Sequence, residues 1–212
     1  MFQNRKEAGA SLAETLSTRT NVKGFKVLGI PRGGVVVAGE IARILGLELA
    51  PMHAVKIRAP WNPELAIGAV AAGIDPILDP QWSGHPSLDE GALSVAEQRA
   101  RRDLEDRERA FGGPGELLGR RILLVDDGIA TGYTVLAAMR SLNAAGVREL
   151  VVAAPVAAPR SAAALEKECD LFVALAEPAG FMAVGQYYRE FSAVPEGEVW
   201  RILREARGEP GE

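Results

Sequence analysis

Two adjacent carboxylates precede a loop of small and hydroxyl residues in the stretch RILLVDDGIATGYT, residues 121–134. The side chains of Asp126 and Asp127 can accept hydrogen bonds from a vicinal diol. The loop after them contains two glycines and two threonines, whose backbone amides and hydroxyl groups can bind a phosphate at the start of a helix. A diol site and a phosphate site about one ribose apart match a ribose 5-phosphate.

Regular structure is predicted on both sides of this loop. The apolar run 122–125 is too short for a helix and is typical of a buried parallel strand. Asp126 and Asp127 then mark the carboxyl end of that strand, which is where ligands bind in open α/β sheets. Beyond the loop, apolar residues at helical spacing predict a helix that starts near residue 135 and ends at Gly146.

A second candidate anion site follows another predicted strand. Residues 26–30 form a short apolar strand, and a helix is predicted over 35–45. Between them, Pro31 and Arg32 precede two glycines, which let a backbone approach a ligand closely. Arg32 adds positive charge beside the dipole of the helix. These residues also suit an ordinary turn, so we interpret them as an anion site only in combination with the first motif.

The loop at 128–134 differs from two common phosphate-binding motifs. It has no lysine, which the P-loop of NTPases requires, and its glycines lack the G-x-G-x-x-G spacing of dinucleotide-binding folds. The stretch 121–134 instead resembles the 5-phosphoribosyl 1-pyrophosphate (PRPP) motif of type I phosphoribosyltransferases, an apolar strand and two acids followed shortly by Thr-Gly and a hydroxyl residue. Residues 31–34 resemble the pyrophosphate loop that this family carries after its first core strand, often with a strained or cis peptide.

The resemblance implies an α/β fold with a mostly parallel twisted sheet, helices on both faces and a small hood formed by the chain ends. We expect a single domain over residues 1–212, with its core at about 26–175. Further elements of this core are predicted as a helix at 159–167 and strands at 51–57, 66–72, 151–155 and 171–175.

The implied reaction displaces pyrophosphate from C1 of PRPP with a nitrogen nucleophile of a small-molecule acceptor. Mg²⁺ would bridge pyrophosphate and ribose oxygens, mostly through water, and we assign no side chain as a metal ligand. By the resemblance, the pyrophosphate is held by Arg32, Gly33 and Gly34. The residues that hold the ribose and its 5-phosphate are Asp126, Asp127, Gly128, Ala130, Thr131, Gly132, Tyr133 and Thr134.

The family has a mobile catalytic loop that closes over PRPP and often brings a basic residue to the pyrophosphate. The corresponding segment here is 58–65, which contains two prolines, an asparagine and a tryptophan. Lys56 and Arg58 are the candidate catalytic cations. We expect this segment to be among the more mobile parts of the unliganded protein, because a lid must open to exchange substrate.

Residues 75–115 are interpreted as an insertion before the motif strand. A long helix is predicted over 87–111, with Ser87 as its N-cap and Glu90 completing a capping box. Opposite charges four residues apart cover the second half of this helix, which predicts a solvated face rather than a nucleic-acid-binding surface. At the other end of the chain, the helix predicted over 2–18 either packs on the domain or contacts a second copy in a homodimer.

Aromatic residues gather near the C-terminus of the chain. In the family a variable hood holds the acceptor, and aromatic rings offer flat apolar faces on which a base can stack. The segment 177–207 is therefore either part of such a hood or a region whose rings pack inward. A final helix is predicted over 196–207, and the last five residues are expected to fray. The aromatic residues concerned are Phe181, Tyr187, Tyr188 and Phe191.

Composition and charge narrow the class of protein. The chain has 212 residues, a net charge of −4 and a mean hydropathy of +0.04, which indicate a soluble globule and argue against nucleic acid as the main partner. Cys169 is the single cysteine, as expected for a reducing compartment. The polar start and the lack of a long apolar run predict no signal peptide and no membrane span, so the cytoplasm is the expected location.

Two other functions stay open at this level. One is a non-catalytic regulator that senses PRPP or a nucleotide, because fold alone does not determine function. The other is a carboxylate-metal phosphohydrolase that uses Asp126 and Asp127, although the further acids and histidines of a two-metal site are lacking. Ala130 restricts the range of possible acceptors. Family members that act on 6-oxopurines carry an aspartate at that place, which can assist proton transfer. We therefore expect hypoxanthine and guanine to be poor acceptors.

Overall fold

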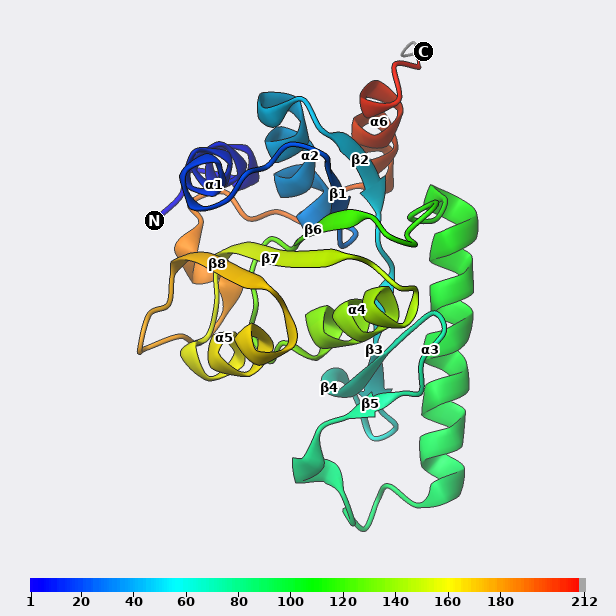
Figure 1. Ribbon diagram of the computed structural model, residues 1–212. Coiled ribbons are helices and arrows are strands. Elements are labelled where there is room, and N and C mark those ends of the chain that lie inside the picture. Colours follow the sequence, from blue (N-terminus) through cyan, green and yellow to red (C-terminus); the bar gives the residue numbers. More distant parts are fainter. Residues whose placement is uncertain (210–212) are drawn as a thin grey trace.

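The computed structural model describes residues 1–209 and contains two β-sheets (Figure 1). The larger is a five-stranded sheet in the order β2-β1-β6-β7-β8. All its neighbouring strands pair in parallel, as is usual for a sheet that is covered on both faces. Its strands are β1 (Phe25–Gly29), β2 (Glu48–Pro51), β6 (Arg121–Val125), β7 (Glu149–Val156) and β8 (Leu171–Ala176).

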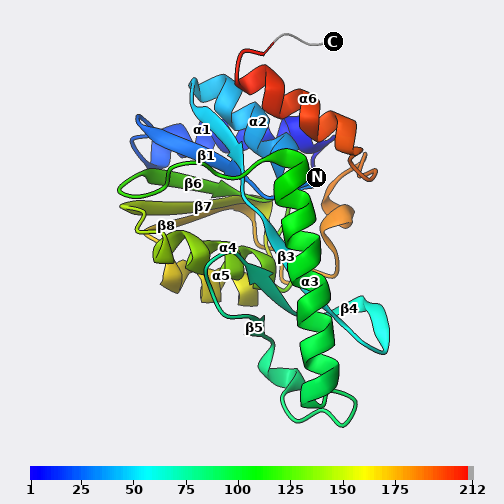
Figure 2. The same ribbon diagram turned by 90° about the vertical axis from the view of Figure 1, so that its right-hand side faces the viewer.

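Helices cover both faces of this sheet (Figures 1 and 2). Successive side chains of a strand point to opposite faces. Val27 and Leu123 accordingly join one apolar cluster, and Leu28 and Leu124 join the other. The predicted α/β fold with a parallel sheet and helices on both faces is confirmed. One layer holds α1 (Arg5–Arg19), α2 (Gly33–Leu45) and α6 (Glu196–Ala206), and the other holds α4 (Tyr133–Ala144) and α5 (Pro159–Leu165).

The chain leaves β1 and β6 at neighbouring points of the sheet. These two strands are adjacent and parallel, in a register that pairs Gly29 with Val125. Ile30 N extends the pairing by donating to Val125 O at 2.9 Å. Because carboxyl ends of parallel strands lie at the same edge, the two predicted ligand loops start side by side.

A smaller antiparallel sheet lies beside the parallel one (Figure 2). The long helix α3 (Glu90–Phe111) packs on it and buries Ala96, Ala100 and Leu104, which are spaced one turn apart. Most of the charged residues of the helix lie on its exposed remainder. The strands of this sheet are β3 (Ala54–Ala59), β4 (Asn62–Ala71) and β5 (Ile77–Leu78).

The prediction of a single strand over 51–57 is wrong. The chain leaves the parallel sheet after Pro51 and enters the antiparallel sheet at Ala54, so the segment contributes to two strands. A change of sheet within one apolar segment leaves no local signal, because both sheets bury their strands. Only the tertiary pairing separates them.

The predicted capping box of the long helix is also wrong. The helix begins at Glu90, and its N-cap is Asp89 rather than Ser87. Asp89 Oδ1 accepts a hydrogen bond from Ala92 N at 2.7 Å. A carboxylate at this place both satisfies a free amide and interacts favourably with the helix dipole.

Residues 58–65, the expected lid, form the end of β3, a tight turn and the start of β4. At the turn, Trp61 stacks on His85 with ring centroids 4.6 Å apart. The pairing of the two strands shifts register on both sides of Arg58. The segment is thus a β-hairpin whose tip packs on a neighbouring loop, and its mobility stays a prediction.

The start of the chain lies next to a segment close to its end. Phe2 N donates to Tyr187 O at 2.7 Å, and Arg189 N donates to Phe2 O at 2.9 Å. These bonds place α1 beside residues 184–191. Of the last five residues, expected to fray, 210–212 lie outside the described residues. The hood role of 177–207 stays a prediction.

Candidate active site

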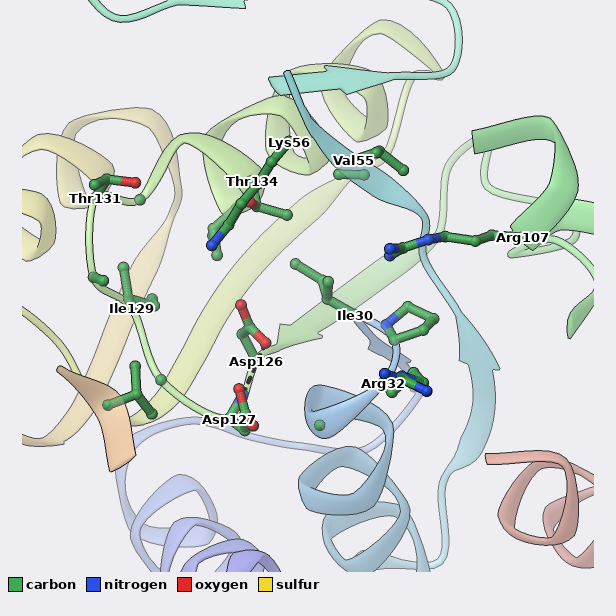
Figure 3. A pocket seen from close by; sticks show the side chains of 18 of the residues that line it. Ile30, Arg32, Val55, Lys56, Arg107, Asp126, Asp127, Ile129, Thr131 and Thr134 are labelled. Atoms are coloured by element: carbon green, nitrogen blue, oxygen red, sulfur yellow. Dashed lines mark hydrogen bonds between the residues drawn. The ribbon is translucent and has the colours of Figure 1, made fainter. Parts of the chain in front are cut away.

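A cavity of about 400 Å³ opens at the carboxyl ends of β1 and β6 (Figure 3). The first predicted loop contributes Asp126 and Thr134 to its lining, and the second contributes Arg32. Two further elements reach it, with Lys56 from β3 and Arg107 from α3. The motifs identified in the sequence therefore meet in one cavity. We call Asp126, Asp127 and residues 128–134 the acid wall, and Arg32, Lys56, Arg58 and Arg107 the cation wall.

Gly33 and Gly34 allow the two loops to pack against each other. A Cβ atom added to Gly33 would lie 1.9 Å from Asp127 Oδ2, and one added to Gly34 would lie 2.8 Å from Val125 O. Real Cβ atoms essentially never approach other atoms so closely. A larger residue at Gly34 would therefore displace the backbone at the end of β6, and one at Gly33 would displace the Asp127 side chain. The structure thus gives these glycines a packing role, since they make room for the strand end and the acid pair. Their predicted contact with a ligand stays a prediction.

Asp126 lies directly at the end of β6 and faces the cavity (Figure 3). Its Oδ1 accepts a hydrogen bond from Asp127 N at 2.9 Å. Burial, and after it the charge of Asp127, raise the pKa of the Asp126 carboxyl well above its usual range, while Lys56 opposes the shift. Hydroxyl donors from a ligand would stabilise the ionised form of this acid.

Asp127 is held by both ends of the chain. Arg5 Nε lies 2.7 Å from Asp127 Oδ2, and these side chains are only 12% and 17% exposed. The Tyr188 hydroxyl donates to the backbone oxygen of Asp127 at 2.6 Å. The guanidinium of Arg5 also lies over the ring of Phe191, 4.0 Å from its centroid. Sequence reasoning missed Arg5, which is one of several charged residues at the start of an ordinary helix.

The loop after the acid pair leads into α4. Gly132 is the N-cap of that helix, with a φ of +80° that favours glycine. Ala130, Thr131 and Thr134 line the cavity beside the helix N-terminus. The Ser161 hydroxyl fixes the loop from outside by donating to Ala130 O at 2.6 Å. Free backbone amides and two hydroxyl groups therefore face the cavity, as an anion site requires.

Not every predicted site residue faces the cavity. Within residues 1–209, the cavity lining includes neither Tyr133 nor Gly34. The Tyr133 side chain packs against the core instead, and burial followed by a hydrogen bond with Asp79 raises its pKa. Gly128 does line the cavity, but Val184 covers it so closely that an added Cβ would lie 2.3 Å from Val184 Cγ1.

The cation wall comes from three separate parts of the chain. Arg32 follows β1 through a cis peptide bond after Pro31, and Lys56 and Arg58 lie on β3. Arg58 also donates to the backbone oxygen of Pro63 within the hairpin. Arg107 reaches the cavity from α3, the helix for which the sequence predicted only a solvated face. A signal was present, because Arg107 falls on the apolar stripe of that helix, between Leu104 and Phe111.

The four aromatic residues near the C-terminus form two stacked pairs. Phe181 stacks on Tyr187 and Tyr188 stacks on Phe191, with centroids 5.6 and 5.0 Å apart. Tyr188 packs inward at 5% exposure, and burial is the main cause of its raised pKa. Of the four residues, only Phe191 belongs to the cavity lining. One of its faces is covered by Arg5, and the side chain is 36% exposed.

In residues 1–209 there is no group of three or more His, Cys, Asp or Glu side chains that could hold a metal ion. In the same part of the chain, every helix falls short of the length and apolarity that a bilayer span requires.

Comparisons with known proteins identify the family of this chain. Residues 2–179 match the model of the phosphoribosyl transferase domain. A curated putative phosphoribosyl transferase of Mycobacterium tuberculosis (strain H37Rv) is 36% identical over 209 residues, which are 97% of this chain and 47% of that protein. The chain thus spans about half the length of the curated relatives it matches.

A solved structure extends the comparison to three dimensions. The crystal structure of TT1426 from Thermus thermophilus is 41% identical, covers 96% of this chain and 98% of its own, and superimposes with a TM-score of 0.76. The family match extends over most of the chain and includes both ligand loops and the whole parallel sheet. The protein therefore belongs to the phosphoribosyl transferase domain family.

Proposed function

We propose that this chain is a phosphoribosyltransferase that displaces pyrophosphate from PRPP with a nitrogen nucleophile. One observation carries the proposal: an acid pair, a helix N-terminus with hydroxyl groups, and four cations line the same cavity. Each of these groups suits one part of PRPP, namely the diol, the 5-phosphate and the pyrophosphate. Family membership supports the same assignment.

The acid wall would hold the ribose 5-phosphate. The amides at the start of α4, together with Thr131 and Thr134, suit the 5-phosphate because the helix dipole favours negative charge there. Asp126 and Asp127 suit the 2- and 3-hydroxyls of the ribose. Arg5 orients Asp127 from behind, so this carboxylate is in place before the sugar arrives.

The cation wall would stabilise the leaving pyrophosphate. The bond from C1 to the pyrophosphate oxygen breaks as the acceptor nitrogen bonds to C1, so negative charge grows on the leaving group. Arg32 and the backbone at Gly33, with Lys56 and Arg58 on β3, lie where that charge would be stabilised. Catalysis by such a site consists mostly of positioning and charge stabilisation.

The residues present fit Mg²⁺ bound largely through the substrate. Three carboxylates line the cavity, namely Asp103, Asp126 and Asp127, but within residues 1–209 no three such side chains form a group that could hold a metal ion by themselves. Mg²⁺ usually takes one or two carboxylates and completes its shell with substrate phosphates and water. When bound, the ion would neutralise part of the charge on the pyrophosphate.

One small residue restricts the range of possible acceptors. Ala130 lines the cavity in the phosphate loop and has no titratable group, so it cannot assist proton transfer to or from a base. We therefore propose that the acceptor is a compound other than a 6-oxopurine. Efficient turnover of hypoxanthine or guanine, equal to that of the best acceptor found, would contradict this.

Two measurements test the proposed function. Titration calorimetry with PRPP and Mg²⁺ tests binding, and pyrophosphate release across a panel of bases and amines tests turnover. Both binding and release are expected from a phosphoribosyltransferase. Binding without release from any acceptor favours the PRPP-sensing alternative, and the absence of binding contradicts both functions.

A further inference from the structure

One charged residue lies on the buried stripe of α3. Arg107 follows Leu104 by one turn and precedes Phe111 by one turn, and both apolar residues are buried. The Arg107 side chain is half-buried and points into the cavity (Figure 3). Placing a charge on such a stripe costs free energy unless a partner compensates it.

The neighbours of Arg107 do not supply that compensation. Burial is the main cause of its lowered pKa, and the like charges of Arg32 and Arg58 add to the shift. The charges of Asp103 and Glu196 oppose it without reversing it. Within residues 1–209, none of the three arginines forms an ion pair with a carboxylate. The cation wall thus lacks a counter-charge at bonding distance and suits an anion with several oxygens.

The position of the wall indicates which anion it binds. Thr131 and Arg107 lie on opposite sides of Asp126 (Figure 3). A PRPP molecule with its 5-phosphate at Thr131 and its ribose at Asp126 would therefore extend its pyrophosphate toward Arg107. Arg32, on the predicted pyrophosphate loop, lies at the same side of the cavity.

We propose that Arg107 binds the pyrophosphate group of PRPP, which makes α3 part of the active site. The inference rests on the proposed function. A guanidinium can donate to two phosphate oxygens at once, and on a packed helix it is held at a defined place. Arg58 lies instead on the 58–65 hairpin that was predicted as a mobile lid, and Lys56 lies two residues before it on β3. Arg107 would then contact the pyrophosphate from a helix rather than from the lid.

The experiment compares two ligands across three variants. Arg107→Gln removes the charge, and Arg107→Lys keeps the charge without the two-pronged donor. Arg102→Gln is the matched control, because Arg102 is an exposed arginine of the same helix and is not part of the cavity lining. Affinities for pyrophosphate and for ribose 5-phosphate are measured by calorimetry in the presence of Mg²⁺, and thermal unfolding checks the fold.

Arg107→Gln is expected to weaken pyrophosphate binding at least about tenfold, since a hydrogen bond to a charged group has this magnitude. Ribose 5-phosphate binding should stay within about twofold, because the acid wall is untouched. Arg102→Gln should change neither affinity. If Arg107→Gln does not fold, Arg107→Lys takes its place, and the same selective loss is expected.

Two results would overturn the role of Arg107 and leave the proposed function standing. They are an unchanged pyrophosphate affinity in the Arg107 variants and an equal loss of affinity for both ligands. A different result concerns the proposed function. If the unaltered protein binds neither pyrophosphate nor PRPP, that function is wrong and the role of Arg107 falls with it. The two failures are distinguishable because the first occurs in a protein that binds PRPP.

Discussion

The acid wall and the cation wall of the cavity differ in how their charged groups are held. Asp127 is paired with Arg5, and Tyr188 donates to its backbone oxygen. Within residues 1–209, Arg32 and Arg107 have no carboxylate at ion-pair distance. The acid wall is thus assembled without a ligand, whereas these two cations lack a paired carboxylate. Under the proposed function, the ribose site would be preorganised, and the cations opposite it would supply the attraction for the pyrophosphate.

The largest effect is expected at Gly33, which follows Arg32 of the cation wall and packs against Asp127 of the acid wall. Gly33→Ala places a Cβ atom 1.9 Å from Asp127 Oδ2, so the Asp127 carboxylate must leave its place beside Arg5. We expect PRPP affinity to fall by at least about a hundredfold, as displacements near 1 Å do in active sites. The free energy of unfolding should fall by about 1–3 kcal/mol. Calorimetry and urea unfolding measure these changes.

Gly113→Ala is the control for this substitution. No atom lies within 4 Å of a Cβ added at Gly113, and its φ is not in the left-handed region. PRPP affinity equal to that of the unaltered protein is expected for it. Equal behaviour of the two alanine variants would mean that the close approach of the loops has no role.

The next effect concerns the acid pair itself. Replacing both Asp126 and Asp127 with Asn removes two charged acceptors, and PRPP affinity should fall about tenfold to a hundredfold. Pyrophosphate affinity should change little, because the cation wall is intact. Calorimetry with both ligands decides the matter, and unchanged PRPP affinity would make the ribose assignment wrong.

A smaller effect is expected when the support of the acid wall is removed. Arg5→Gln leaves Asp127 without its charged partner in a place that is largely shielded from water. The free energy of unfolding should fall by about 1–3 kcal/mol, and PRPP affinity should fall by less than in the double Asp variant. Arg19→Gln at the exposed end of the same helix serves as control. Identical results for both variants would show that Arg5 does not position Asp127.

The smallest effect is a pH dependence of stability. The pKa of Asp126 is raised in the folded protein, so its ionisation favours the unfolded state. Its contribution to stability is present below the unfolded pKa and is lost as pH rises through the folded pKa. Asp126→Asn should therefore gain stability relative to the unaltered protein as pH rises. Urea unfolding at several pH values measures this gain, and a constant difference would contradict the raised pKa.

The sequence by itself determined the acid wall and the type of fold. The strand, the acid pair, the loop and the helix of residues 121–144 are contiguous, and local patterning encodes such units because each residue needs only its neighbours to be placed. The parallel sheet with helices on both faces was predicted from the resemblance that these residues carry. Asp126, Thr131 and Thr134 all line the cavity, as their spacing predicted.

Tertiary structure alone decided the cation wall and the support of the acid wall. Arg5 is 122 residues from Asp127 in sequence, and Arg107 lies on the helix before the motif strand, so neither belongs to the motif itself. Sequence patterning did not show that these two charges reach the cavity. The split of 51–57 between two sheets and the contact of Gly33 with Asp127 are likewise long-range. Periodicity tells which face of an element is buried, but the partner of that face is selected by packing of the whole chain.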